Sequence, residues 1–206
     1  MNKNINKEII KFFDATVDHY PLNSSQIVGW RSKEEQLLRF EVLTSNTSLS
    51  GCSLLDIGCG VGDLYGYLAN RQLKVDYTGI DLHKKMIVYA KKKYSDGNFV
   101  CCDFAKIKKK YDFVVASGTF NLAIKDNYAY VYDMISRMCF LANKGVAFNL
   151  LGTMAPFDIR CSDLFYYEPK NILEYCRENN KMVNIIDNYL PHEFTVFINK
   201  KSGGLK

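Results

Sequence analysis

Three glycines directly after a short apolar segment constrain the fold of this chain more than any other feature. The stretch reads Leu54-Leu-Asp-Ile-Gly-Cys-Gly-Val-Gly-Asp-Leu. Glycine adopts backbone conformations that other residues resist, and it lets a ligand approach the backbone closely. A helix that begins behind such a turn offers unpaired N–H groups and the positive end of its dipole. The stretch therefore predicts a strand, a turn formed by Gly58, Gly60 and Gly62, and a helix, with a ligand bound at the turn.

Strand and helix patterns alternate along most of the chain. Such alternation favours parallel βαβ units, and two closing strands without a long helix between them favour an antiparallel hairpin. We therefore expect an α/β fold: a Rossmann-like, doubly wound sheet that is mostly parallel, with a C-terminal antiparallel hairpin. The expected strands are 53–57, 75–81, 99–102, 111–116, 145–151, 182–186 and 194–198, and the expected helices are 63–71, 84–94, 128–141 and 171–180.

The rest of the chain fits one domain with a helical N-terminal lid or lead-in over residues 1–50. Leu37, Leu38 and residues 40–43 are the expected buried stripe of this lead-in. The cofactor core is expected over 51–151, followed by a substrate-side loop and the terminal hairpin over 152–206. Turn residues at 143–145 predict a helix stop before the fifth strand, and Asp187-Asn188 with Pro191 predict the boundaries of the last two strands.

Composition excludes several classes of protein. The 206 residues are 48% hydrophobic and 24% charged, as in soluble globular domains. No apolar run approaches the ~20 residues that span a bilayer, and the polar start lacks a secretory signal, so we expect a cytoplasmic protein. Seven cysteines without C-x-x-C spacing and three scattered histidines predict no metal site. The net charge of +5 comes with lysine clusters that lack interleaved aromatics, which disfavours a nucleic acid as partner.

The spacing of the glycine loop separates two kinds of nucleotide fold. A dinucleotide fingerprint is G-x-G-x-x-G, whereas this loop reads G-x-G-x-G after the acid Asp56. The combination resembles motif I of the class I S-adenosylmethionine-dependent methyltransferases. The resemblance implies S-adenosylmethionine as cofactor, with the loop, Cys59 included, wrapping its methionine portion and Asp56 near its amino group.

Further residues at strand ends extend this resemblance over residues 50 to 151. Asp81, followed by Leu82, ends the second expected strand, where a carboxylate can accept hydrogen bonds from ribose hydroxyls. Asp103 follows the third strand, and the resemblance implies that it accepts from the adenine amino group beside Phe104. The residues after the fourth strand that match positions lining the reactive methyl group are Ser117, Gly118 and Asn121.

The sequence leaves the methyl acceptor open. The position after the fourth strand reads Ser117-Gly-Thr-Phe, without the Pro-Pro tetrad of enzymes that methylate base or glutamine amines, and no Pro-Cys pair occurs. We expect transfer to an oxygen or nitrogen of a small molecule by in-line displacement. The alternatives are an RNA or protein methyltransferase and a catalytically silent S-adenosylmethionine-binding partner subunit. A nicotinamide oxidoreductase is disfavoured by the loop spacing.

Residues outside the core are candidates for catalysis and for closing the site. A general base is needed only if the nucleophile arrives protonated. Trp30 and Arg31 precede a helix and could close over the cofactor, with Arg31 pairing its carboxylate. The aromatic-rich stretch 152–168 predicts a lid. The candidate bases are His19, Tyr20, His192 and Glu193.

Overall fold

A mixed sheet of seven strands organises the computed structural model, which describes residues 3–21, 24–29, 31–180 and 182–200. The strand order is β3-β2-β1-β4-β5-β7-β6. In chain order the strands are β1 (Ser53–Ile57), β2 (Asp76–Asp81), β3 (Asn98–Cys101), β4 (Tyr111–Ala116), β5 (Ala142–Leu151), β6 (Met182–Leu190) and β7 (Glu193–Asn199). The helices are α1 (Lys3–His19), α2 (Lys33–Ser45), α3 (Asp63–Asn70), α4 (Lys84–Lys93), α5 (Asn127–Leu141) and α6 (Pro169–Asn179), with short 3₁₀ turns η1 (Ser25–Val28), η2 (Phe104–Lys106) and η3 (Phe157–Ile159).

The sheet is parallel except at β7. Strand β1 lies between β2 and β4 and pairs with both in parallel. Strand β7 inserts between β5 and β6 and is antiparallel to both. The predicted fold class is therefore confirmed, including the terminal hairpin. Because β1 and β4 are neighbours, the strand order reverses beside β1, and this reversal opens a crevice at the carboxyl ends of the strands.

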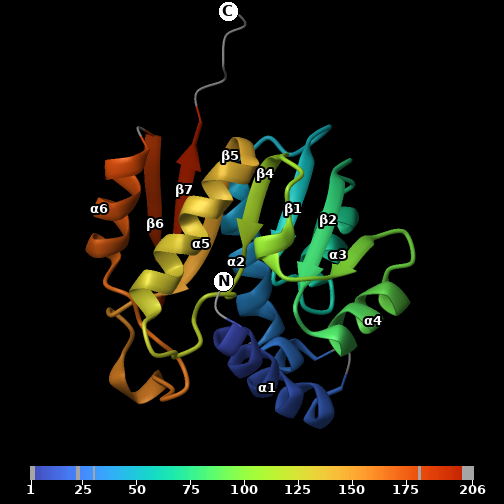
Figure 1. Ribbon diagram of the computed structural model, residues 1–206, viewed down its shortest axis with the longest axis horizontal. Coiled ribbons are helices and arrows are strands. Elements are labelled where there is room, and N and C mark those ends of the chain that lie inside the picture. Colours follow the sequence, from blue (N-terminus) through green and yellow to red (C-terminus); the bar gives the residue numbers. More distant parts are fainter. Residues whose placement is uncertain (1–2, 22–23, 30, 181, 201–206) are drawn as a thin grey trace, which may run out of the picture.

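Helices cover both faces of the sheet (Figure 1). Side chains of α2, α3 and α4, such as Leu43, Leu68 and Ile87, form one buried cluster with one face. Side chains of α5 and α6, such as Met138 and Ile172, form another cluster with the opposite face. Burial of these apolar surfaces supplies the main driving force for folding.

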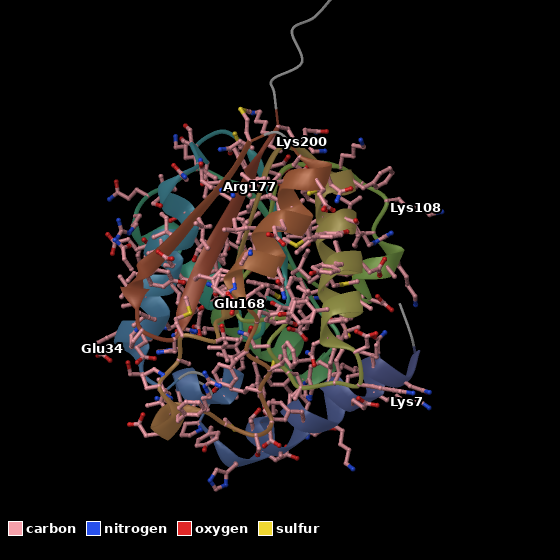
Figure 2. All side chains as sticks on the ribbon, turned by 90° about the vertical axis from the view of Figure 1, so that its left-hand side faces the viewer. Lys7, Glu34, Lys108, Glu168, Arg177 and Lys200 are labelled. Atoms are coloured by element: carbon pink, nitrogen blue, oxygen red, sulfur yellow. The ribbon has the colours of Figure 1, made fainter. Side chains whose placement is uncertain are left out.

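Helix α1 lies across the carboxyl end of the parallel strands instead of on a face of the sheet (Figure 1). Lys7 on α1 and Glu34 at the start of α2 lie at the same end of the molecule, on opposite flanks (Figure 2). The helical lead-in is thus present, and its two helices approach the end of the sheet where ligands bind in such folds.

Two expected boundaries are wrong. Strand β5 begins directly after α5, so Asn143–Gly145 belong to the strand and not to a turn. Asp187 and Asn188 lie within β6, in a stretch where the register with β7 shifts between Ile186 and Leu190. In both places the strand continues through residues with a local turn preference, and the pairing register is irregular there. Leu37 of the expected buried stripe is 41% exposed.

Candidate functional site

The glycine loop joins β1 to α3 with three residues in the left-handed region. The φ angles of Gly58, Gly60 and Gly62 are 67°, 53° and 82°. The loop is fastened to the end of β2, because the carbonyl of Ile80 accepts the N–H of Gly58 at 2.8 Å. Oδ2 of Asp81 accepts the N–H of Gly60 at 2.9 Å. The strand that carries Asp81 therefore also fixes the shape of the loop.

All three glycines are also required by close packing, since a Cβ atom at Gly62 would lie 2.8 Å from the ring of Phe99. A Cβ atom at Gly58 would lie 2.6 Å from the side chain of Thr119, and one at Gly60 would lie 2.6 Å from Cγ1 of Val28. Such distances are well below van der Waals contact. The loop is thus pressed between the end of β4 and the 3₁₀ turn η1 of the N-terminal region.

Asp56 is a buried carboxyl group at the end of β1. Its side chain is 3% exposed, and the hydroxyl of Tyr77 donates to its Oδ2 at 2.6 Å. Burial raises the pKa of Asp56 to about 7, although the Tyr77 hydrogen bond opposes the rise. Asp56 lines the pocket and therefore presents either a carboxylate or a proton donor to a ligand near neutral pH.

The two other predicted acids hold the adjoining loops. Oδ1 of Asp81 accepts the N–H of His83 at 2.7 Å, and burial raises the pKa of Asp81. Oδ1 of Asp103 accepts the N–H of Ala105 at 2.7 Å and so caps η2. A carboxylate offers about four lone-pair sites. Both acids therefore keep acceptor capacity for a ligand.

The end of β4 is held by a residue that the sequence analysis missed. Asn149 in β5 is fully buried. Its Oδ1 accepts the N–H of Gly118 at 2.6 Å, and its Nδ2 donates to Oγ of Ser117 at 3.2 Å. The available signal was an amide in the otherwise apolar run 146–151, which is typical of a buried polar group with a specific partner.

Helices α1 and α2 form a cap over the loop, defined by Ile9, Ile10 and Phe13 of α1 and Gln36 and Phe40 of α2, which line the pocket. The lid or lead-in predicted over residues 1–50 contains both helices, but the sequence analysis did not single out the α1 residues that line the pocket. The signal was the spacing of its apolar residues, which repeats every three or four positions, as on one face of an amphipathic helix.

Most predicted cofactor residues meet in this pocket. Gly62, Asp103 and Asn121 lie beside it. Asn121 connects neighbouring segments. Its Oδ1 accepts the N–H of Leu151 at 3.0 Å, and its carbonyl accepts the N–H of Phe165 at 2.7 Å. The predicted residues that line the pocket are Asp56, Gly58, Cys59, Gly60, Asp81, Leu82, Phe104, Ser117 and Gly118.

Arg31, one of the two predicted closing residues, is not among the residues that line the pocket. The guanidinium of Arg31 is exposed and donates to the carbonyl of Ile159 in η3. In this structure the Arg31 side chain is therefore engaged with η3, and its pairing with a cofactor carboxylate stays a prediction. Trp30 lies outside the described residues. The contact between Arg31 and Ile159 joins the N-terminal region to the expected lid, residues 152–168.

The four candidate bases fall into two pairs, neither of which lines the pocket. His19 and Tyr20 meet edge to face at the end of α1, with ring centroids 4.8 Å apart. His192 and Glu193 lie at the start of β7, where Leu151 of β5 pairs with Glu193. Because β7 is antiparallel, its start lies at the same edge of the sheet as the pocket.

His192 and Glu193 are engaged with Arg39 of α2. Nε of Arg39 pairs with Oε2 of Glu193, and Nη2 of Arg39 lies 3.1 Å from Nε2 of His192. Burial raises the pKa of Glu193 to about 7, against the opposing effect of Arg39. Burial and the charge of Arg39 lower the pKa of His192. The buried ion pair ties α2, and with it part of the cap, to β7.

The described part of the chain contains neither a candidate metal site nor a candidate membrane-spanning helix. Within residues 3–21, 24–29, 31–180 and 182–200, no group of three or more His, Cys, Asp or Glu side chains could hold a metal ion. No helix in those ranges is long and apolar enough to cross a membrane.

The chain is similar to known methyltransferases in sequence and in fold. Residues 54–140 match a family described as a methyltransferase domain. The protein Rv1506c of Mycobacterium tuberculosis, a proposed methyltransferase, is 32% identical over 158 residues, which are 73% of this chain and 94% of that protein. A malonyl-[acyl-carrier protein] O-methyltransferase of Acetivibrio thermocellus is 38% identical over 77 residues, which are 35% of this chain and 27% of that enzyme.

Among solved structures, the magnesium protoporphyrin IX methyltransferase of Synechocystis PCC 6803 with bound S-adenosylhomocysteine superposes with a TM-score of 0.68. The superposition covers 95% of this chain and 99% of that chain at 17% sequence identity. At that identity the likeness concerns the fold.

Proposed function

This chain belongs to the S-adenosylmethionine-dependent methyltransferases, and on that premise we propose that it methylates an oxygen or nitrogen nucleophile of a small molecule by in-line displacement. The observation that carries this proposal is the cap. Because α1 and α2 cover the glycine loop with apolar side chains, the acceptor must enter a confined, largely apolar pocket. A small molecule, or a small group on a flexible arm, fits such an entrance better than a folded macromolecule does.

The residues of the pocket fit the cofactor. S-adenosylmethionine carries a sulfonium and an ammonium group, and Asp56 and Asp81 supply acceptors in the pocket wall. The ring of Phe104 and the side chain of Leu82 offer apolar surface for a planar base. We propose that Asp81 accepts from the ribose hydroxyls, that Asp103 accepts from the adenine amino group, and that Asp56 lies near the amino group of the methionine portion.

The chemical demand on the protein is mild. The bound sulfonium supplies an already activated methyl group. The residues of this chain must hold the nucleophile in line at near-attack distance and exclude water. Ser117 and Gly118, fixed by Asn149, form the wall at the end of β4, and the cap excludes water. We propose that Arg39 and Glu193 hold α2 in place and that Glu193 does not act as a general base. The nucleophile of the acceptor must then arrive with a free lone pair, as a carboxylate or a neutral amine does.

Names of relatives support an acceptor of this kind. The similar enzymes of Acetivibrio thermocellus and Synechocystis are named for a malonyl group on a carrier protein and for a porphyrin. The first of these names specifies transfer to oxygen. Since this chain matches only 27% of the Acetivibrio enzyme, that name supports the reaction type and leaves the acceptor to experiment.

Release of S-adenosylhomocysteine tests the proposal. The purified chain is incubated with labelled S-adenosylmethionine and panels of carboxylic acids, amines and phenols, with total RNA and a protein extract as parallel acceptors. Label transferred to a small molecule supports the proposal, whereas label found only in RNA or protein overturns it. Micromolar cofactor binding with no turnover on any panel would favour a catalytically silent binding subunit.

A further inference from the structure

One buried acceptor atom at the edge of the pocket has no partner. Nδ2 of Asn6 on α1 donates to Oδ2 of Asp103 at 2.7 Å. Oδ1 of the same amide is buried, and no described residue hydrogen-bonds to it. The orientation of the amide follows from chemistry, because a carboxylate accepts hydrogen bonds and only Nδ2 can donate one. The orphaned atom is therefore an oxygen, and burying it without a donor costs free energy.

The orphaned oxygen of Asn6 lies close to residues that line the proposed cofactor pocket. Ile9 and Ile10, one turn further along α1, line the pocket, and so does Phe104, the neighbour of Asp103. Lys7, the next residue on α1, is exposed and points away from the body of the molecule (Figure 2). The Asn6 side chain therefore lies on the inward face of α1, at the Phe104 end of the pocket.

We propose that Asn6 and Asp103 together recognise the exocyclic amino group of adenine, with Oδ1 of Asn6 accepting one N–H and the carboxylate of Asp103 accepting the other. The inference rests on the adenine role proposed above for Asp103. An adenine amino group is a pure donor of two hydrogen bonds, whereas a 6-oxopurine presents a carbonyl oxygen at the same place. Two acceptors side by side match the first group and repel the second.

The same contact makes cap closure depend on the base. Asn6 belongs to α1, while Asp103 belongs to the loop after β3. A ligand that bonds to both holds α1 against the core, and it supplies the donor that the buried oxygen lacks. We therefore expect α1 to be protected more strongly by an adenine-bearing ligand than by its 6-oxo counterpart.

The test compares two ligands on one variant. Dissociation constants are measured calorimetrically for S-adenosylhomocysteine and for its deaminated form, S-inosylhomocysteine. The native chain should prefer the adenine form by about tenfold or more, as expected for a polar site left with mismatched groups. In Asn6→Ala, S-adenosylhomocysteine should bind about five- to tenfold more weakly, and the preference should fall by a similar factor.

Further variants separate this inference from its premise. Asp103→Ala should also reduce the preference. If Asp103→Ala reduces it and Asn6→Ala does not, the role of Asn6 is overturned and the adenine role of Asp103 stands. If neither variant changes it, both assignments fail. Equal weakening of the two ligands in Asn6→Ala means that the residue only docks α1, and this also overturns the inference.

Two controls complete the design. Lys7→Ala, at the exposed neighbouring position of the same helix, should leave the preference between the two ligands unchanged and controls for altered helix propensity. Hydrogen exchange of α1 amides should slow more on binding S-adenosylhomocysteine than on binding S-inosylhomocysteine in the native chain. Equal protection by the two ligands would contradict the coupling of α1 to the base.

Discussion

The site has two halves: a loop half, made of the glycine loop with Asp56 and Asp81, and a cap half, made of α1 and α2 with their polar contacts to Asp103 and Glu193. The two halves differ in how far apart their hydrogen-bonded residues lie along the chain. In the loop half, Asp81 reaches Gly60 and Tyr77 reaches Asp56, each across 21 positions. In the cap half, Asn6 reaches Asp103 across 97 positions, and Arg39 reaches Glu193 across 154. The two hydrogen bonds of the loop half form within one βα unit and the strand that follows, whereas those of the cap half form only when the first helices meet the loop after β3 and the last strand.

This difference predicts how each half responds to substitution. Changes in the loop half should act on cofactor affinity, because its groups face the ligand. Changes at the Arg39–Glu193 pair of the cap half should act first on stability, because these charged groups are buried and do not line the pocket. The following predictions test that division, beginning with the largest expected effect.

Removal of the buried cation of the cap should have the largest effect. In Arg39→Met, Glu193 keeps a buried carboxylate without its partner, so the free energy of unfolding should fall by about 3–5 kcal/mol. Chemical denaturation measures the change. The double variant Arg39→Met/Glu193→Leu should recover most of the loss, since it removes the buried carboxylate of Glu193 and leaves only the partly exposed Glu35 without its Arg39 partner. A single variant as stable as the native chain would contradict the proposed anchoring of α2.

Substitution in the glycine loop should come next. Gly60→Ala combines a left-handed φ with a Cβ atom 2.6 Å from Val28, and we expect it to weaken cofactor binding by about 2–3 kcal/mol. Gly51→Ala is the matched control. Its φ is also left-handed, at 74°, but a Cβ there would meet nothing within 4 Å. It should cost about 1 kcal/mol of stability and leave cofactor affinity unchanged. Equal affinities in the two variants would refute the packing argument.

The same contrast explains what the sequence could predict. Strands β1 and β4 match their expected ranges, and the acids at the ends of β1 and β2 lie in the pocket wall as expected. Glycine turns and strand-end acids are local signals, so a single sequence carries them. The doubly wound, mostly parallel sheet and the terminal hairpin followed from the alternation of elements and the resemblance of the loop.

The cap was not predictable in the same way. The aromatic and cationic residues Trp30 and Arg31 suggested a closing segment, but Arg31 bonds to the carbonyl of Ile159. The apolar face of α1 covers the pocket instead, and an amphipathic pattern does not state which surface it will cover. The contact between Asn6 and Asp103 joins two polar residues that no local pattern connects.

A third prediction concerns the acid at the end of β2. Asp81→Ala should weaken S-adenosylmethionine binding by about 1–3 kcal/mol, since ribose hydroxyls and the amide of Gly60 lose their acceptor. Asp76→Ala is the control, because Asp76 begins the same strand at its far end with an exposed side chain. It should leave affinity unchanged. Native affinity in a folded Asp81→Ala chain would exclude the ribose role.

The smallest expected effect per pH unit is a change in the pH dependence of stability. Burial raises the pKa of Asp56 from 3.8 to about 7, so between these values the folded chain holds a proton that the unfolded chain releases. Stability from this group is therefore complete below about pH 4 and is lost as the pH rises towards 7. Its slope is at most about 1.4 kcal/mol per pH unit.

Asp56→Asn isolates this contribution. The amide keeps an acceptor for Tyr77 and removes the titration, while Glu193, whose raised pKa has the same sign, is present in both chains. The difference in unfolding free energy between native chain and variant, measured by denaturation from pH 4 to pH 8, should therefore shift against the native chain as the pH rises. A difference that stays constant would mean that Asp56 titrates at its ordinary pKa. The loop half would then hold an ordinary carboxylate at Asp56, whereas the carboxyl group of Glu193 in the cap half would keep its raised pKa.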